Sequence, residues 1–167
     1  MIRPVTLDDV PEIAAFYVDI RRDTVPVVHT IDDVERYISS VLVARGTSYV
    51  WEEDGTILGW VDVGGGGVDQ LYCRRGSTGR GIGKRLLDFA KAQSPAGLQL
   101  YTFQVNAGAR RFYAREGFAE VELGDGSGNE EGQPDVLLAW QPAPFEAADQ
   151  MGWRLAGPMP SREERNA

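Results

Sequence analysis

Apolar residues recur at helical spacing in two stretches near the beginning of the chain. In the first stretch they lie three or four positions apart and follow Thr6-x-x-Asp9, a favourable helix start; they are Val10, Ile13, Ala14 and Tyr17. A second set with the same spacing predicts a helix from Asp32 to about Val43; it comprises Val34, Tyr37, Ile38 and Val41. Residues 21–30 break the period and are predicted to form a loop.

Short runs rich in β-branched and aromatic residues predict strands around these helices. Asp54-Gly55 separates two such runs, which is typical of a β-hairpin, and Gly64–Gly67 is predicted to be a turn. The predicted strands are residues 2–5, 48–52, 56–63, 68–73, 98–103, 118–123 and 135–140, and the remaining helices are residues 81–93 and 106–116. This order predicts a mixed α/β domain whose sheet is antiparallel at first and parallel across its central βαβ unit.

The pattern changes after Gln141, where periodicity gives way to prolines at 142, 144, 158 and 160. We therefore predict one domain over residues 1–141 and a C-terminal extension over residues 142–167. Apolar side chains in the extension are compatible with docking on the domain or with a homodimer; they are Phe145, Met151, Trp153 and Leu155. The polar end, residues 161–167, is predicted to be disordered.

Composition narrows the class of protein. The chain of 167 residues fits one domain, and its 25 acidic against 17 basic residues argue against nucleic-acid or anionic-membrane partners. The single cysteine excludes an internal disulfide and indicates a reducing compartment. No apolar run is long enough to span a bilayer, and no charged-then-apolar leader begins the chain. We therefore expect a cytoplasmic protein.

A glycine-rich segment, GSTGRGIGK at residues 76–84, joins a predicted strand to a predicted helix and indicates a phosphate-binding site. The helix N-terminus carries unpaired N–H groups and partial positive charge, and glycines let a ligand approach the backbone. The P-loop pattern G-x-x-x-x-G-K-[ST] is not met, because Thr78 replaces its first glycine and Arg85 its hydroxyl residue. The dinucleotide pattern G-x-G-x-x-G fits poorly, because the glycines here give G-x-G-x-G.

Three motifs in order make the chain resemble the GCN5-related N-acetyltransferase (GNAT) superfamily. Residues 78–83, TGRGIG, resemble its pyrophosphate loop [QR]-x-x-G-x-[GA], with Thr78 in place of Gln or Arg. Residues 69–73, DQLYC, resemble its D-x-L-Y-V strand, and residues 106–118 resemble its N-x-x-A-x-x-F-Y-x-x-x-G-F segment. Ile2–Thr6 resembles its first strand, so the resemblance covers roughly residues 1–141.

The resemblance implies the GNAT fold, an α/β fold with a mixed central sheet of six to seven strands and about four helices, whose central parallel strands splay apart. It also implies acetyl-CoA as the acetyl donor and no metal. The loop backbone would hold the pyrophosphate, the Arg80 and Lys84 side chains could add charge, and the strand backbone would bind the pantetheine arm. The implied cofactor-binding residues are Leu71, Tyr72, Cys73, Thr78, Gly79, Arg80, Gly81, Ile82, Gly83, Lys84, Asn106 and Phe112.

Two side chains are candidates for catalytic roles, Tyr113 from the resemblance and Asp69 from its face of the predicted strand, which it shares with Leu71 and Cys73. Tyr113 lies where the family has a tyrosine near the thioester sulfur, so it is the expected general acid; the alternative is an aromatic side chain packed on a helix face. Asp69 is the candidate base, through water, with a solvated or substrate-orienting carboxylate as the alternative. Cys73 is not expected to be a nucleophile, because His29 is the only histidine and nothing marks an activated thiolate.

The sequence therefore predicts an acetyl-CoA-dependent N-acetyltransferase acting on a primary amine of a small molecule or peptide. His29 and the carboxylate-rich loop 125–135 are candidates for the acceptor side, and each has the alternative of a solvated loop. Two other functions stay open at this point. One is O-acetylation, and the other is a catalytically silent CoA-binding module.

Overall fold

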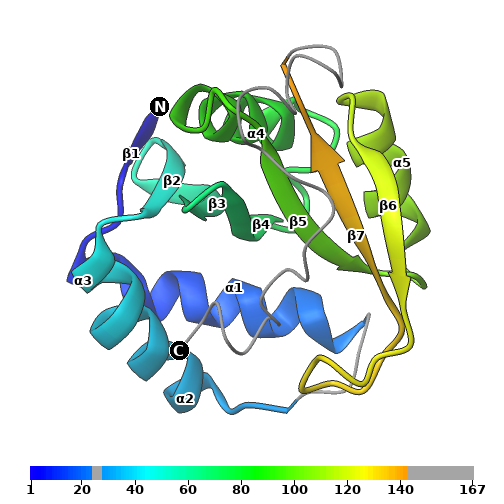
Figure 1. Ribbon diagram of the computed structural model, residues 1–167. Helices are drawn as coiled ribbons and strands as arrows, with labels where there is room; N and C mark the ends of the chain where they lie inside the picture. The colour runs from blue at the N-terminus through cyan, green and yellow to red at the C-terminus, as the bar shows by residue number, and fades with distance from the viewer. Residues whose placement is uncertain (24–27, 143–167) are drawn as a thin grey trace. The chain divides into compact units, whose positions relative to one another are not determined.

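The protein has a mixed α/β fold, which the computed structural model in Figure 1 describes for residues 1–23 and 28–142. Seven strands are hydrogen-bonded in the order β1-β2-β3-β4-β5-β7-β6. The chain divides into two compact units, Met1–Gly64 with Val68–Gln93, and Gly65–Gly67 with the chain from Ser94 onward. The predicted α/β fold of seven mixed strands and four helices is thus confirmed over the part of the chain that the structure describes.

The first unit begins with an antiparallel arrangement of strands, as predicted. β1 pairs with β2 and β2 with β3, and Val50 lies opposite both Arg3 and Trp60. The elements are β1 (Ile2–Pro4), the 3-10 helix η1 (Leu7–Asp9), α1 (Val10–Arg22), α2 (Ile31–Tyr37), the π-helical segment η2 (Ile38–Leu42), α3 (Val43–Arg45), β2 (Ser48–Glu53), β3 (Thr56–Gly64), β4 (Gly67–Cys73) and α4 (Ile82–Gln93).

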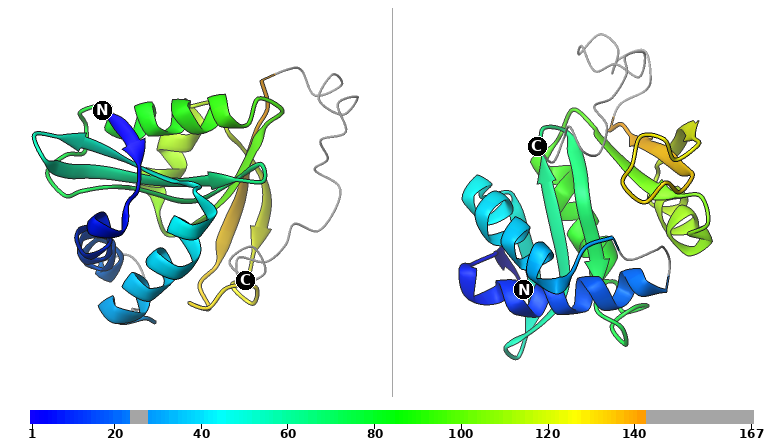
Figure 2. Two further views of the ribbon diagram at one scale, coloured as in Figure 1. Left: turned by 90° about the vertical axis from the view of Figure 1, so that its left-hand side faces the viewer. Right: turned by 90° about the horizontal axis from the view of Figure 1, so that it is seen from below.

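Helices cover both faces of β2 and β3, with α1 and α2 on one face and α4 on the other (Figure 2, left view). Gly59 in β3 permits the close approach of α4, because a Cβ there would lie 2.7 Å from Leu86 Cδ1 and 3.0 Å from Ile82 Cγ2. On the α1 face, Trp60 is fully buried and its ring lies 5.8 Å from that of Tyr17. Burial of these apolar side chains is the main source of stability in this unit.

The predicted second helix, Asp32 to about Val43, extends from Ile31 to Arg45 and is π-helical in its middle. Within it, the hydroxyls of Ser39 and Ser40 donate hydrogen bonds to carbonyls one turn earlier, at 2.8 and 2.5 Å. Such side-chain bonds compete with the backbone N–H groups for the same carbonyls and disturb regular α-helical bonding. The spacing of apolar residues predicts the helix but carries no signal for this irregularity.

The last strand of the second unit lies between the two strands that precede it. β7 is antiparallel to both neighbours, and Leu138 is opposite Leu100 on one side and Glu120 on the other. Gly67 of β4 pairs in parallel with Gln99, which confirms the predicted parallel connection. The splaying of the central strands stays a prediction. The elements are β5 (Leu98–Phe103), α5 (Ala107–Arg115), β6 (Ala119–Gly124) and β7 (Asp135–Trp140).

The turn predicted at Gly64–Gly67 is shorter, because Gly64 still belongs to β3 and Gly67 already belongs to β4. The predicted extension, residues 142–167, lies outside the described residues apart from Pro142, so its docking, its disordered end and the homodimer stay predictions. Among residues 1–23 and 28–142, no helix is both long and apolar enough to cross a membrane.

Asp9 connects β1 to the first helices. The Arg3 guanidinium donates two hydrogen bonds to its carboxylate, at 2.7 and 2.9 Å, and the Thr6 N–H donates a third at 2.8 Å. The Asp9 residue is only 8% exposed. The bonds from Arg3, followed by those from Thr6, outweigh burial and hold the pKa of the Asp9 carboxyl below its ordinary value.

We expect Asp9→Asn to lower the free energy of unfolding by about 2 kcal/mol at neutral pH, because charge-assisted bonds to Arg3 are lost. A carboxyl with a lowered folded-state pKa contributes stability above its unfolded pKa of about 3.9 and loses it as the pH falls through the folded value. The difference from the wild type should therefore shrink below about pH 4 in urea unfolding. Exposed Asp8 offers the control Asp8→Asn. A deficit of equal size at both pH values would contradict the prediction.

Candidate functional site

Two arginines lie between the end of β4 and the glycine loop. The Arg74 side chain donates to Glu12 of α1 at 2.6 Å and to the carbonyl of Ile57 in β3 at 2.7 Å. Its guanidinium also lies 5.1 Å from the centre of the Phe16 ring. Arg74 therefore holds the chain against both α1 and β3 at the point where β4 ends.

Arg75 makes a second connection to the same helix. Its Nε donates to the Asp19 carboxylate at 2.7 Å, its Nη2 to the Asp19 carbonyl at 2.8 Å, and it also forms an ion pair with Asp23. Neither arginine was predicted from the sequence to be a site residue. The available signal was that Glu12 and Asp19 are seven positions apart and so share a face of α1, opposite two adjacent cations.

The glycine loop lies between this point and α4. Gly79 and Gly81 both have φ of +80°, a left-handed conformation that side chains rarely adopt. Ser77 N–H bonds the Arg74 carbonyl at 3.0 Å, and Arg85 N–H bonds the Gly81 carbonyl at 3.1 Å as the helix begins. The first N–H groups of α4 have no acceptor within the helix, so they face the loop as donors.

The space in front of the loop fits an anionic ligand. A Cβ built at Gly79 or Gly81 would meet no heavy atom within 4 Å, so the backbone there borders open space that a side chain would enter. Alternating left-handed glycines turn successive N–H groups toward one side, and a helix N-terminus adds partial positive charge. These residues therefore suit a pyrophosphate group.

Both cationic side chains of the loop have acidic partners. Arg80 donates to Glu53 at the end of β2, at 2.7 Å, and Lys84 donates to Asp88, one turn along α4, at 3.2 Å. All four side chains are at least one-third exposed. Thr78, where the family pattern has Gln or Arg, is exposed.

The side chain of Tyr72 in β4 packs against α1. Its ring lies 5.1 Å from that of Tyr17, edge to face, and stacks on Trp60 at 6.2 Å. Its hydroxyl accepts a hydrogen bond from Arg21 at 3.3 Å. The Tyr72 side chain therefore packs within the first unit. By strand alternation, the other face of β4 carries Asp69, Leu71 and Cys73, all of them partly buried.

Asn106, Phe112 and Tyr113 belong to the second unit. Asn106 is the N-cap of α5, because its Oδ1 accepts a hydrogen bond from Ala109 N at 3.1 Å. Tyr113 is 7% exposed, and its ring lies 5.1 Å from that of Phe112 and 5.5 Å from that of Phe118. The helix thus fixes the phenol between two aromatic rings.

The acceptor-side candidates are of two kinds. His29 is exposed in the loop before α2. In the loop 125–135, Asn129 is buried and organises the turn, donating to the Gln133 carbonyl at 2.8 Å and to the Asp135 carboxylate at 3.1 Å. Asn129 and Asp135 therefore have structural partners, whereas Asp125 is exposed at the beginning of the loop.

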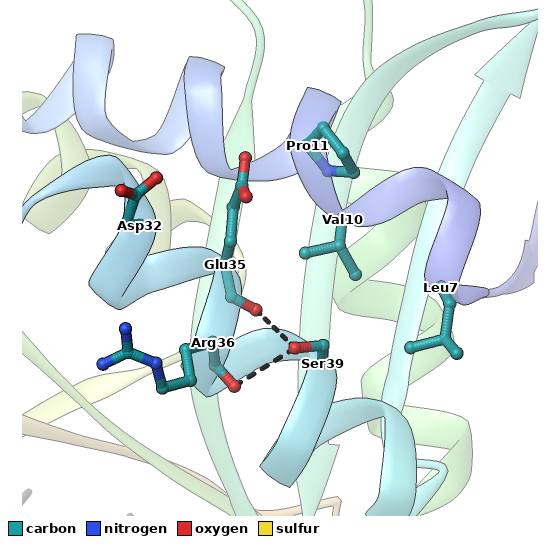
Figure 3. A pocket seen from close by; sticks show the side chains of 7 residues that line it. All are labelled: Leu7, Val10, Pro11, Asp32, Glu35, Arg36 and Ser39. Carbon is teal, nitrogen blue, oxygen red and sulfur yellow. Dashed lines mark hydrogen bonds between the residues drawn. The ribbon is translucent and has the colours of Figure 1, made fainter.

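A separate pocket lies between the beginning of α1 and α2 (Figure 3). It has a volume of about 430 Å³, and Ser39 at its edge bonds the backbone of the same helix. It contains none of the residues that the sequence analysis assigned to the site. The lining residues are Leu7, Val10, Pro11, Asp32, Glu35, Arg36 and Ser39.

The profile of the Acetyltransferase (GNAT) family matches residues 14–118, which include β4, the glycine loop and α5. The chain belongs to this family. It is an N-acetyltransferase of the GNAT type, as the sequence motifs predicted. A curated relative is the peptidyl-lysine N-acetyltransferase YiaC of Escherichia coli (strain K12), 31% identical over 121 residues, which are 71% of this chain and 73% of that protein.

Solved GNAT structures share the fold. The apo form of YjaB from Escherichia coli superposes with a TM-score of 0.68 and 22% identity, over 84% of this chain and 96% of that one. PaiA N-acetyltransferase from Thermoplasma acidophilum, solved in complex with coenzyme A, gives a TM-score of 0.64 and 20% identity, over 84% and 98%. The GNAT family uses acetyl-CoA, which agrees with a loop suited to pyrophosphate.

We expect Gly81→Val to weaken CoA binding about tenfold or more, because the valine side chain would enter the space in front of the loop. Gly76→Val is the matched control. Gly76 has φ of +82° and equally open surroundings but precedes residues 78–83, the segment that resembles the pyrophosphate loop, so a side chain strains the backbone at both glycines alike. Titration calorimetry with CoA measures both variants. An equal loss in the two, or no loss in Gly81→Val, would contradict the assignment of the loop.

Burial raises the pKa of the Cys73 thiol, which therefore stays protonated at neutral pH. Because alkylating reagents react with the thiolate, we expect iodoacetamide to modify the native protein about tenfold more slowly than the urea-unfolded protein. The gap should narrow as the pH rises. We expect Cys73→Ala to keep full acetyl transfer, because a protonated thiol is a poor nucleophile; loss of turnover in this variant would show that the thiol takes part.

Proposed function

We propose that this chain transfers the acetyl group of acetyl-CoA to the ε-amine of lysine side chains in peptides or proteins. The observation that carries the proposal is the relationship to a peptidyl-lysine N-acetyltransferase, which extends over 71% of the chain. The acidic balance of the protein, with a formal net charge of −8, supports a cationic acceptor, because it attracts lysine-rich segments over several ångströms.

The loop and β4 bind the donor in this proposal. Backbone N–H groups from Gly79 to Lys84, at the N-terminus of α4, hold the pyrophosphate, and the backbone of Leu71–Cys73 pairs with the amides of the pantetheine arm as an added strand would. The remaining donor contacts come from Asn106, the N-cap of α5, and from Phe112, which precedes Tyr113 within that helix. Bound acetyl-CoA supplies an activated thioester, so the protein need only position it and move protons.

Two side chains move the protons. Asp69 accepts the proton of the lysine ammonium through a water molecule, which leaves the nitrogen lone pair free to attack the acetyl carbon. As the carbon–sulfur bond breaks, the Tyr113 hydroxyl gives its proton to the departing sulfur, and the second proton that the acetylated nitrogen loses passes through water to restore the Tyr113 hydroxyl. The burial of Tyr113 between Phe112 and Phe118 supports this role, because a fixed phenol needs little reorganisation to donate.

The loop that ends in β7 is a candidate for lysine recognition. Hydrogen bonds from Ser127 hold the pKa of the Asp125 carboxyl below its ordinary value, so this exposed side chain is charged at neutral pH. The buried Asn129 side chain bonds the backbone of Gln133 and so fixes the turn. The exposed Asp125 carboxylate therefore has a defined place in this loop. A fixed negative charge at this position favours a cationic peptide over a neutral amine.

We expect Tyr113→Phe to lower the turnover number for a lysine-containing peptide by about tenfold to a hundredfold, with CoA affinity unchanged, because only the proton donor is removed. CoA release is measured with lysine peptides and with small amines. Tyr49→Phe is the control, since Tyr49 packs on Phe89 of α4 and loses only a hydroxyl.

Three outcomes separate the alternatives. Full turnover of Tyr113→Phe across the pH range would remove the general acid from the mechanism. CoA binding without turnover on any acceptor would show a silent binding module. Turnover on small amines or alcohols but not on peptides would keep the transferase and overturn the lysine acceptor.

A further inference from the structure

Glu53 holds the one arginine of the glycine loop. The Arg80 Nη2 lies 2.7 Å from Glu53 Oε2, although the two residues are 27 positions apart. The other carboxylate oxygen, Oε1, accepts a hydrogen bond from Trp51 Nε1 at 2.9 Å. Each oxygen of Glu53 thus has its own donor, and the carboxylate has a fixed place beside the loop.

The indole that fixes Glu53 is itself covered by a residue of α4. The Arg85 guanidinium lies 5.0 Å from the centre of the Trp51 ring, within the range of a cation–π contact. The chain of contacts Arg80–Glu53–Trp51–Arg85 therefore leads from the loop, through the end of β2, back to the first turn of the helix that the loop opens.

This carboxylate is charged at neutral pH. The hydrogen bond from Trp51, followed by that from Arg80, holds the pKa of Glu53 below its ordinary value. The Arg80 side chain is half exposed and that of Glu53 about one-third, so the ion pair is weak compared with a buried one. A pyrophosphate carries more charge than a carboxylate and presents several oxygens to a planar guanidinium, so it competes well for the same side chain.

We propose that Glu53 competes with the pyrophosphate for the Arg80 side chain and thereby limits the affinity of the loop for CoA. The inference rests on the proposed use of acetyl-CoA at this loop. Because release of CoA must follow every transfer, a partner that takes back the Arg80 guanidinium favours dissociation of the product. Glu53 acts through Arg80 and not on the reacting atoms.

The test is a double-mutant cycle in CoA affinity, measured by titration calorimetry on the full chain. We expect Glu53→Gln to bind CoA about fivefold more tightly at low ionic strength. This change in affinity corresponds to the upper end of the free energies that exposed ion pairs contribute. High salt should reduce the gain, because it screens the guanidinium. In the Arg80→Gln background, Glu53→Gln should have no effect, since the side chain for which Glu53 competes is gone.

Glu52→Gln is the charge-matched control. Glu52 is adjacent in β2, but its carboxylate pairs with Arg3 instead, so its removal changes the net charge equally and should leave CoA affinity unchanged. Thermal unfolding of each variant checks that the fold persists.

The outcomes distinguish this inference from the function on which it rests. Unchanged or weaker CoA binding by Glu53→Gln would overturn the inference alone. A gain that persists in the Arg80→Gln background, or that appears equally in Glu52→Gln, would show a general charge effect and would also overturn it. Absence of CoA binding by the unmodified protein would overturn the proposed function and this inference together.

Discussion

The bonds that Arg74 and Arg75 make with α1 are the constraint on which the glycine loop depends. Each arginine donates from one nitrogen to a carboxylate and from another to a backbone carbonyl. The two bonds together fix both the position and the orientation of the guanidinium. Their partners Glu12 and Asp19 lie on a helix that is held by the core through Ile13, Ala14 and Phe16. The chain therefore leaves β4 in one direction.

The other end of the loop is held by packing rather than by charge. α4 sits close to β3 because Gly59 has no side chain to keep Leu86 and Ile82 away. Because both ends of the loop are held, the few residues between Ser77 and Ile82 have little conformational freedom. Glycines in the left-handed conformation allow the backbone to make the tight turns that this short connection requires. A binding loop that is ordered before its ligand arrives loses less conformational entropy on binding.

The sequence predicted most of the elements, because their signals are local. Helical spacing found α1 and the helix that begins with α2, and Asp54-Gly55 found the hairpin of β2 and β3. The loop was recognised from glycine spacing and its flanking strand and helix, which together exclude the commoner phosphate loops. These features depend on neighbours within about a dozen residues.

What stayed hidden depends on partners far along the chain. Nothing near Arg80 points to Glu53, and nothing near Arg74 points to Glu12, because strand order decides which side chains meet. The π-helical segment contains two serines whose hydroxyls bond the backbone, a feature that the spacing of apolar positions does not reveal. The acceptor side is likewise beyond local reasoning, since it consists of loops whose residues, such as Asn129, have structural roles that only the folded turn reveals.

The place of β7 between β5 and β6 has a consequence for synthesis of the chain. The strand β5 emerges from the ribosome well before β7, its antiparallel partner. The strand β6 also pairs with β7 and is also synthesised before it. Until translation passes Trp140, both earlier strands have open edges toward the place that β7 will fill, and open edges are where chains associate wrongly. In nascent chains of this protein the edges of β5 and β6 therefore stay exposed until β7 has been synthesised and pairs with both.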